Sequence, residues 1–234
     1  MSYATINPYT NEVVQQFPFA TDAEVEEAIA QADTTFQTWK STSFSRRAEV
    51  MRKAAALLRK DKPAYAKILT LEMGKLTAEA EAEVELSAQI FEYYATNAEA
   101  LLKPEKLPVA DPAEGEAIVV HDPLGVLLAI EPWNFPYYQI ARIIAPQLSA
   151  GNTILLKHAS NVPQSAAIFE KLMREAGLPL GGFKNLYATR SQIETILNDP
   201  RVCGVALTGS EEAGAVVAGQ AAKALKKSTL ELGG

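Results

Sequence analysis

The fold is decided by the stretch Leu124–Lys157, LGVLLAIEPWNFPYYQIARIIAPQLSAGNTILLK. It begins with an apolar run at Val126–Ile130, breaks into the Pro-flanked turn Glu131–Pro136, and ends with a second apolar run, Thr153–Leu156, that leads into Lys157. Two short apolar runs separated by a helix-length segment and a Gly-Asn break predict a strand, a crossover helix and a parallel strand. Both strands then end at the same edge of a sheet, where open α/β sheets bind their ligands.

The alternation of strands and helices continues through residues 124–234. The strands that we predict are Val126–Glu131, Thr153–Lys157, Phe183–Tyr187, Val202–Leu207 and Ser228–Leu232. The predicted helices lie near Pro136–Ser149, Pro163–Glu175, Ser191–Leu197 and Glu211–Leu225. Such alternation is typical of a Rossmann-like open parallel sheet with helices on both faces.

Residues 1–102 predict helices instead, after a start that reads as a loop or short edge strands. Thr21 and Glu24 have the spacing of a capping box and precede apolar residues at helical intervals. Pro63 and Gly74 suit the first position and the end of a later helix. Further helices are expected at Ser45–Lys60 and Thr77–Leu102. We therefore predict a helical first portion.

Residues 103–123 shift in composition to Pro, Asp and Gly around two short runs, Leu107–Ala110 and Ala117–Val120. This pattern predicts a hairpin arm. Because an exposed strand pair is a template for a partner strand, we expect the arm to serve oligomerisation and the protein to form a homo-oligomer. The predicted fold class is thus α/β, with a helical portion (1–102), an arm (103–123) and a parallel sheet of about five strands (124–234).

The composition is that of a globular protein with a sizeable core, because 48% of the 234 residues are hydrophobic and 21% are charged. A net charge of −6 argues against nucleic acid and anionic membranes as partners. The single Cys203 excludes an internal disulfide. With no apolar run near the roughly 20 residues of a membrane span and no leader pattern, we predict a cytoplasmic location.

Polar residues follow four of the predicted strands at their carboxyl ends. They are Trp133-Asn134, Lys157, Thr208-Gly209-Ser210 and Glu231. Any one of them alone is as well explained by a solvated rim, but four at one edge favour a ligand site.

Lys157 ends an apolar strand, so its ammonium suits a phosphate or a ribose hydroxyl, or else simply reaches solvent from the strand end. Gly209-Ser210 opens a helix directly after a strand, where backbone N–H groups can accept an anion. Glu211 and Glu212 in the first turn of that helix would repel a tightly seated phosphate. We expect a nucleotide to lie across this edge with loose phosphate contact.

Asn134 offers an amide donor on a turn held by two prolines, which suits an oxyanion stabiliser, or else it caps the next helix. Glu231 lies in the apolar strand Thr229–Leu232. A carboxylate in apolar surroundings has a raised pKa and can act as a general base, whereas on an edge strand it would point to solvent. We expect Cys203 to be a buried, inert thiol, and neither His121 nor His158 has metal-ligand spacing, so we predict no metal site.

Taken together, these motifs resemble the NAD(P)-dependent aldehyde dehydrogenases. The resemblance covers essentially the whole chain and rests on Pro132–Pro136, Leu155–Ala159, Leu207–Ser210 with Gly214, Leu230–Gly234 and, less specifically, Glu72–Lys75. The runs Tyr137–Gln139, Lys157–Val162 and Ala224–Lys227 are most similar to the bacterial succinate-semialdehyde dehydrogenase branch.

The resemblance implies a reaction in which a cysteine thiolate attacks an aldehyde, the oxyanion gives hydride to a nicotinamide, and water hydrolyses the thioester. It assigns the oxyanion to Asn134 and the activation of water to Glu231. It places the cofactor against Trp133, Asn134 and Leu232 at the nicotinamide end, Lys157, His158, Ala159 and Ser160 near the ribose, and Gly209 and Ser210 near the pyrophosphate. Ser160 stands where NAD-preferring members often have Glu, so NAD and NADP both remain open.

One part of the family pattern is absent from this sequence. The nucleophilic cysteine of the family follows the Glu-Leu-Gly-Gly motif, in a catalytic domain that the 234 residues do not contain, and Cys203 precedes Glu231. The resemblance therefore implies that residues 1–234 are a cofactor-binding domain, inactive on an aldehyde by itself. The alternatives are a non-catalytic nucleotide-binding or subunit-interaction module, and a fragment of an intact enzyme that is prone to self-association through exposed apolar surface.

Overall fold

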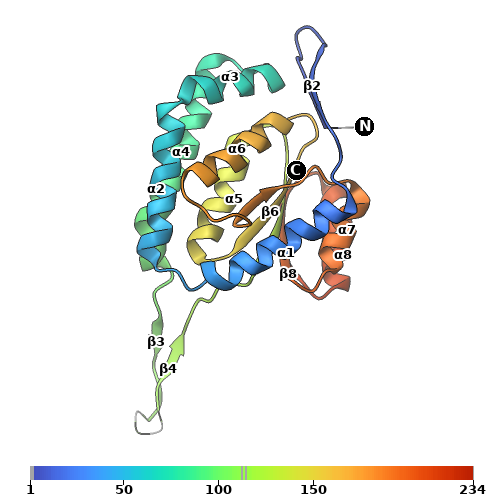
Figure 1. The fold of residues 1–234 in the computed structure, drawn as a ribbon. Helices are drawn as coiled ribbons and strands as arrows, with labels where there is room; N and C mark the ends of the chain where they lie inside the picture. Colours follow the sequence, from blue (N-terminus) through green and yellow to red (C-terminus); the bar gives the residue numbers. More distant parts are fainter. Residues whose placement is uncertain (1–2, 112, 114, 234) are drawn as a thin grey trace.

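The computed structural model describes residues 3–111, 113 and 115–233 (Figure 1). Residues 112 and 114 of the predicted arm and Gly234 of the last motif lie outside this part of the chain. The first portion consists of β1 (Tyr3–Ile6), β2 (Val13–Phe17), α1 (Asp22–Trp39), α2 (Phe44–Lys60), α3 (Lys62–Met73) and α4 (Thr77–Leu101). Thr21 and Glu24 form the predicted capping box, and Gly74 ends α3 in the left-handed conformation with a φ of 67°.

The remainder forms the predicted α/β sheet. Its elements are β5 (Val126–Glu131), α5 (Pro136–Ala150), β6 (Thr153–His158), α6 (Pro163–Glu175), β7 (Phe183–Asn185), α7 (Arg190–Asn198), β8 (Val202–Gly209), α8 (Glu211–Lys223) and β9 (Lys227–Leu232). The five strands are parallel in the order β7-β6-β5-β8-β9. The prediction of a five-stranded open parallel sheet is confirmed, because buried strands of this kind are continuous apolar runs that the sequence displays directly.

Two hydrophobic cores hold the sheet between its helices. On one face, side chains of α2 to α6 pack with β5 and β6 around Phe91, Tyr137 and Phe169. On the other face, α1, α7 and α8 pack with β5 and β8 around Ile29, Ile196 and others. None of the described helices combines the length and apolar character that a membrane crossing requires.

The arm is a two-stranded hairpin of β3 (Glu105–Leu107) and β4 (Ala117–Val119) that projects from the body below α2 and α4 (Figure 1). The sequence placed the first strand at Leu107–Ala110, a few residues too late. The side chains of β3 are all exposed, so no buried face marks where the pairing begins.

Candidate active site at the edge of the sheet

The polar edge lies where the chain changes direction across the sheet. After β5 the chain continues through α5 on one face, whereas after β8 it continues through α8 on the opposite face. β5 and β8 are neighbours, so the turn carrying Asn134 and the Gly209-Ser210 corner flank the crevice between them. Such a switch point is the usual ligand site of an open α/β sheet.

One cavity at this edge, of about 540 Å³, contains most of the predicted site residues. Its lining includes Trp133, Asn134, Gly209, Ser210, Glu231 and Leu232. Arg142 and Gln139 of α5 line it as well, and the sequence had not singled them out. We call this space the Asn134 cavity.

A second cavity, of about 320 Å³, lies on the other side of Ser210. Lys157 and Arg190 line it together with apolar side chains from Ile130, Leu207 and Val217. Because Ser210 lines both cavities, they adjoin and form one elongated site along the ends of β6, β5 and β8. We call this second space the Lys157 cavity.

Lys157 faces the Lys157 cavity from a half-buried position, with its Nζ 5.7 Å from the centre of the Tyr3 ring. Burial lowers the pKa of its ammonium, and the charge of Arg190 lowers it further. No carboxylate of the described residues is bonded to Lys157, and the cavity holds two cations. Such a cavity suits a phosphate, whereas a lysine that only reaches solvent from a strand end needs no second cation beside it.

The start of α8 has its own cap. Ser210 is the N-cap residue, and its Oγ accepts a hydrogen bond of 3.2 Å from the N–H of Ala213. Gly214 lacks a side chain where a Cβ would come within 2.7 Å of Leu232 Cδ2, so the glycine here serves close packing of α8 against β9. Since Ser210 occupies one donor of the first turn, a phosphate seated tightly on this helix start is disfavoured, as the sequence indicated.

Asn134 is exposed, and the orientation of its amide is fixed from the oxygen side. Its Oδ1 accepts hydrogen bonds from the N–H of Phe135 at 3.1 Å and from Gln139 Nε2 at 3.4 Å. The amide NH₂ has no hydrogen-bond partner among the described residues, and Asn134 lines the Asn134 cavity. The N-cap residue of α5 is Phe135, so the alternative that Asn134 caps this helix is wrong.

Glu231 does not lie in the apolar surroundings that the sequence suggested. It is on β9, the last strand of the described sheet, with its side chain 60% exposed. Its Oε1 is 3.9 Å from Arg142 Nη1. The solvent-facing alternative is therefore the correct one for the side chain of Glu231, because every residue of this edge strand is exposed.

The buried carboxyl group at this edge belongs to Glu131, which the sequence analysis missed. It is the last residue of β5 and is 4% exposed, and its Oε2 has no partner within the described part of the chain. Burial raises the pKa of Glu131 to about 8, although Thr208 and Arg142 act in the opposite direction. The sequence did carry a signal for this burial, because Glu131 directly continues the apolar run Val126–Ile130 of a strand that was expected to be buried.

The family of this chain follows from a comparison of its whole length. The model of the aldehyde dehydrogenase family matches residues 1–234. The chain belongs to the aldehyde dehydrogenase family.

Several relatives of this aldehyde dehydrogenase chain are known. The succinate-semialdehyde dehydrogenase [NADP(+)] of Deinococcus radiodurans is 48% identical over 232 residues, which cover 99% of this chain and 48% of that protein. The enzyme of the same name from Mycobacterium tuberculosis is 47% identical and is covered to 51%. The crystal structure of succinic semialdehyde dehydrogenase from Streptococcus pyogenes with NADP+ has a TM-score of 0.96 at 44% identity, and the chain covers 51% of it. The chain thus spans about half the length of these relatives.

The only cysteine of this aldehyde dehydrogenase chain lies far from the Asn134 cavity. Cys203 is the second residue of β8, and six residues of strand, about 20 Å, separate it from the end at Gly209. Its thiol is half-buried rather than buried as predicted, and its Sγ contacts the carbonyl oxygen of Arg201 at 3.5 Å.

Three residues assigned to the cofactor line neither cavity. His158 is fully buried, and its ring nitrogens lie 3.0 Å from the carbonyl oxygen of Glu131 and 3.1 Å from that of Pro136. Burial lowers the pKa of His158 to about 4, so its ring is neutral at pH 7. Ala159 donates its N–H to the same ring, and Ser160 is exposed. Contacts of these residues with a cofactor stay predictions. The described residues hold no cluster of three or more His, Cys, Asp or Glu that is suited to a metal ion.

Proposed function

We propose that this chain is the cofactor-binding portion of an NADP-dependent aldehyde dehydrogenase that oxidises succinate semialdehyde to its acid. The observation that carries the proposal is the elongated site, in which Asn134 and Glu231 share one cavity and Lys157 and Arg190 share the next. The names of the relatives supply the substrate and the cofactor.

The residues of the Asn134 cavity supply two of the functions that the reaction needs. The free NH₂ of Asn134 donates to the oxyanion that forms when a thiolate adds to the aldehyde carbon. Trp133 and Leu232 line the same cavity and would hold a nicotinamide ring, which would supply the hydride acceptor. Glu231, exposed and within reach of water, removes a proton from the water that hydrolyses the resulting thioester.

The Lys157 cavity favours NADP over NAD. The 2′-phosphate of NADP carries close to two negative charges, and the cavity offers two cations, of which Lys157 is half-buried. Glu212 also lines this cavity, so the phosphate would lie nearer to β6 and α7 than to α8.

The carboxylate of succinate semialdehyde suits Arg142. This residue is the cation among the described residues lining the Asn134 cavity, and its side chain is 32% exposed. Its Nη2 donates to Thr208 Oγ1 at 2.6 Å, which leaves other donors of the guanidinium for a ligand.

Cofactor binding by this chain tests the proposal. Isothermal titration with NADP+ and NAD+ should give tighter binding of NADP+, and Arg190→Gln should weaken NADP+ roughly tenfold while changing NAD+ little. Arg174→Gln removes an exposed cation from α6, on the other face of the sheet, and serves as the matched control. Equal affinities for the two cofactors in every variant would contradict the NADP assignment.

A second measurement tests the expectation that residues 1–234 do not oxidise an aldehyde alone. Cys203 is too far from Asn134 to add to a carbonyl held there. The purified chain should therefore produce no NADPH from succinate semialdehyde above the rate without protein. Steady NADPH production that Glu231→Gln abolishes would overturn this expectation.

The arm favours a second candidate function, that of a subunit-interaction module. Leu107, Ile118 and Val119 are 47%, 44% and 38% exposed on a hairpin that stands away from the body (Figure 1). Exposed strand edges with apolar side chains are templates for pairing with another chain. We expect the chain to self-associate in sedimentation velocity and the double variant Leu107→Lys/Ile118→Lys to dissociate, and a strictly monomeric parent would remove this candidate.

A further inference from the structure

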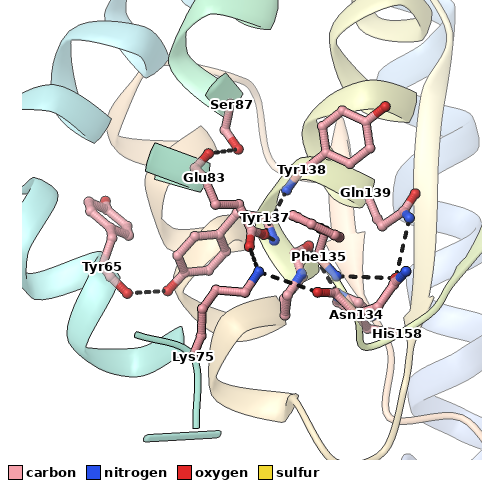
Figure 2. A network of polar contacts seen from close by, with 11 residues as sticks. Tyr65, Lys75, Glu83, Ser87, Asn134, Phe135, Tyr137, Tyr138, Gln139 and His158 are labelled. Atoms are coloured by element: carbon pink, nitrogen blue, oxygen red, sulfur yellow. Dashed lines mark hydrogen bonds and ion pairs between the residues drawn. The ribbon is translucent and has the colours of Figure 1, made fainter. Parts of the chain in front are cut away.

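Two side chains of the helical portion bind the turn that carries Asn134 and the start of the helix that follows it. Lys75 follows Gly74 at the end of α3, and Glu83 lies in the second turn of α4. Figure 2 shows their ammonium and carboxylate groups paired beside the turn. The pair is shielded from water, because the side chain of Lys75 is 9% exposed and that of Glu83 is 1% exposed.

Glu83 replaces the missing cap of α5. The N-cap residue Phe135 has no side-chain acceptor, and Pro136 occupies the first helical position. Glu83 Oε1 instead accepts the N–H groups of Tyr137 at 2.8 Å and Tyr138 at 3.2 Å (Figure 2). These are the two positions that an N-cap side chain normally serves, so a residue on another helix fixes where α5 begins.

Lys75 holds the other half of the turn. Its Nζ donates to the backbone carbonyl oxygen of Asn134 at 3.3 Å and lies 3.9 Å from the centre of the Phe135 ring. The cation thus contacts the two residues that precede Pro136. Lys75 and Glu83 together hold the turn on both sides of that proline, and neither of them lines the Asn134 cavity or the Lys157 cavity.

The position of the Asn134 amide depends on this support. Its Oδ1 accepts from the N–H of Phe135, which Lys75 holds through the ring, and from Gln139, which lies one turn into the helix that Glu83 caps. Both partners of Oδ1 are therefore located by the Lys75–Glu83 pair. A shift of the turn would rotate the NH₂ group away from the cavity, and displacements near 1 Å have large effects on a preorganised donor.

We propose that Lys75 and Glu83 are positioning residues that set the direction of the Asn134 amide donor in the Asn134 cavity. The inference rests on the proposed function, in which that donor stabilises an oxyanion. It assigns to the ion pair a role in the geometry of the site, beyond its contribution to folding.

Nuclear magnetic resonance of the intact chain provides the test. The side-chain NH₂ signal of Asn134, identified by its loss in Asn134→Asp, reports the amide. The chain has two tryptophans. The indole N–H of Trp133 reports the turn, and that of Trp39, which is 1% exposed and donates to the carbonyl oxygen of Leu148 at 3.0 Å, reports the core.

The variants Lys75→Met and Glu83→Gln have matched controls in Lys62, the first residue of α3, and Glu85 of α4. Lys62 and Glu85 form an ion pair of 2.8 Å at the surface, so Lys62→Met and Glu85→Gln make the same chemical changes away from the turn. We expect the first two variants to shift the Asn134 and Trp133 signals and to leave the Trp39 signal unchanged. The two controls should shift none of the three, and Lys75→Arg, which keeps the cation, should restore the parent Asn134 signal.

Hydrogen exchange adds a second readout. Loss of the carboxylate acceptor in Glu83→Gln should speed exchange of the Tyr137 and Tyr138 amides roughly tenfold or more relative to Glu85→Gln. Unchanged Asn134 and Trp133 signals in Lys75→Met and Glu83→Gln would overturn the inference, as would loss of the Trp39 signal at the same time, which would show a folding role only.

NADP+ affinity separates this inference from the proposed function. Because Lys75 and Glu83 line neither cavity, both variants should bind NADP+ within about twofold of the parent. Failure of every protein to bind NADP+ would overturn the proposed function and leave the signals of Asn134 to decide the positioning role. A loss of binding confined to the two variants would contradict a role limited to the Asn134 amide.

Discussion

The two crossover helices next to β6 begin in the same way but are supported differently. Both have an apolar N-cap residue, Phe135 for α5 and Val162 for α6, followed by proline. Neither N-cap side chain can accept a hydrogen bond, and in both cases a glutamate from the helical portion supplies the acceptor. Glu83 serves α5, and Glu72 serves α6 through the N–H groups of Gln164 at 2.9 Å and Ser165 at 3.0 Å.

The difference lies in what balances the buried carboxylate. Glu83 is paired with the ammonium of Lys75. Glu72 instead accepts hydrogen bonds from the hydroxyls of Thr5 at 2.6 Å and Ser165 at 2.7 Å, and burial raises its pKa above the usual range. The start of α5 has a fixed charge pair, whereas the start of α6, at the same edge of the sheet, has neutral donors around its glutamate. A glutamate from another helix can therefore cap a helix start and, at the same time, position a turn, as Glu83 does, or bind a strand, as Glu72 does through Thr5 of β1.

The largest effect on stability is expected for Glu83→Ala, which removes the glutamate at the start of α5. The substitution leaves the shielded Lys75 ammonium unpaired and two N–H groups of α5 without an acceptor. Removing one partner of a buried ion pair costs about 3–5 kcal/mol of unfolding free energy. Urea denaturation monitored by circular dichroism measures this loss, and a loss below about 1 kcal/mol would show that water replaces the carboxylate without difficulty.

A third buried carboxyl group, that of Glu131, differs from those of Glu83 and Glu72 because it caps no helix. Its pKa of about 8 in the folded chain exceeds that of an unfolded glutamate, so the folded state holds the proton more tightly. Its contribution to stability is complete below pH 4.5 and is lost as the pH rises to about 8.

Glu131→Gln cannot ionise, so the variant should gain stability relative to the parent as the pH rises. We expect a relative gain of about 2–4 kcal/mol between pH 5 and pH 9. Urea denaturation of both proteins at the two pH values measures it. A difference between parent and variant that does not change with pH would mean that Glu131 is ionised throughout.

A smaller effect on stability is expected for Glu72→Gln, at the start of α6, where no cation among the described residues pairs with the glutamate. The glutamine keeps one acceptor oxygen for the four donors around Glu72, and no cation is left unpaired among its described partners. We predict a loss of about 1–2 kcal/mol in urea denaturation. Because Glu72 lines neither cavity, NADP+ affinity should stay at the parent value, and a parallel loss of binding would show that the two helix starts are coupled.

The smallest effect is expected for Glu85→Gln, which removes a carboxylate on α4 that is close to Glu83 in sequence but whose side chain is 30% exposed. Glu85 bonds Arg59 at 2.9 Å and Lys62 at 2.8 Å at the surface, where water and salt screen the charges. The loss should stay below about 1 kcal/mol and disappear at 1 M salt. A loss as large as that of Glu83→Ala would mean that burial is not what separates the two glutamates.

The fold was predictable from the sequence wherever burial produces a pattern of apolar residues. The bounds of β5 and α6 match the predicted ranges, because the apolar run of β5 ends just before Pro132 and the amphipathic segment of α6 begins at Pro163. The start of β3 was misplaced because both faces of the arm are exposed. Local patterns of apolar residues therefore predict the strands of the sheet but not those of the arm.

The site was predictable only in part, because its residues meet at the strand ends but are supported from far away in sequence. Asn134 and Ser210 were found through the rule for carboxyl ends of parallel strands. Lys75 and Glu83 were not, since the bonds of Lys75 to Asn134 and of Glu83 to Tyr137 span 59 and 54 residues. The burial of Glu131 and the exposure of Glu231 depend on strand order, which local pattern does not encode.

β9 gives the site a local melting behaviour of its own. Every residue of β9 is exposed, and the strand is hydrogen-bonded only to β8, whereas β5 is paired on both sides. Strands with few buried contacts open at lower free energy than the rest of a sheet. On warming, we therefore expect Glu231 and Leu232 of this chain to leave the Asn134 cavity while Asn134 and the inner strands are still in place. The site would then come apart at a lower temperature than the fold.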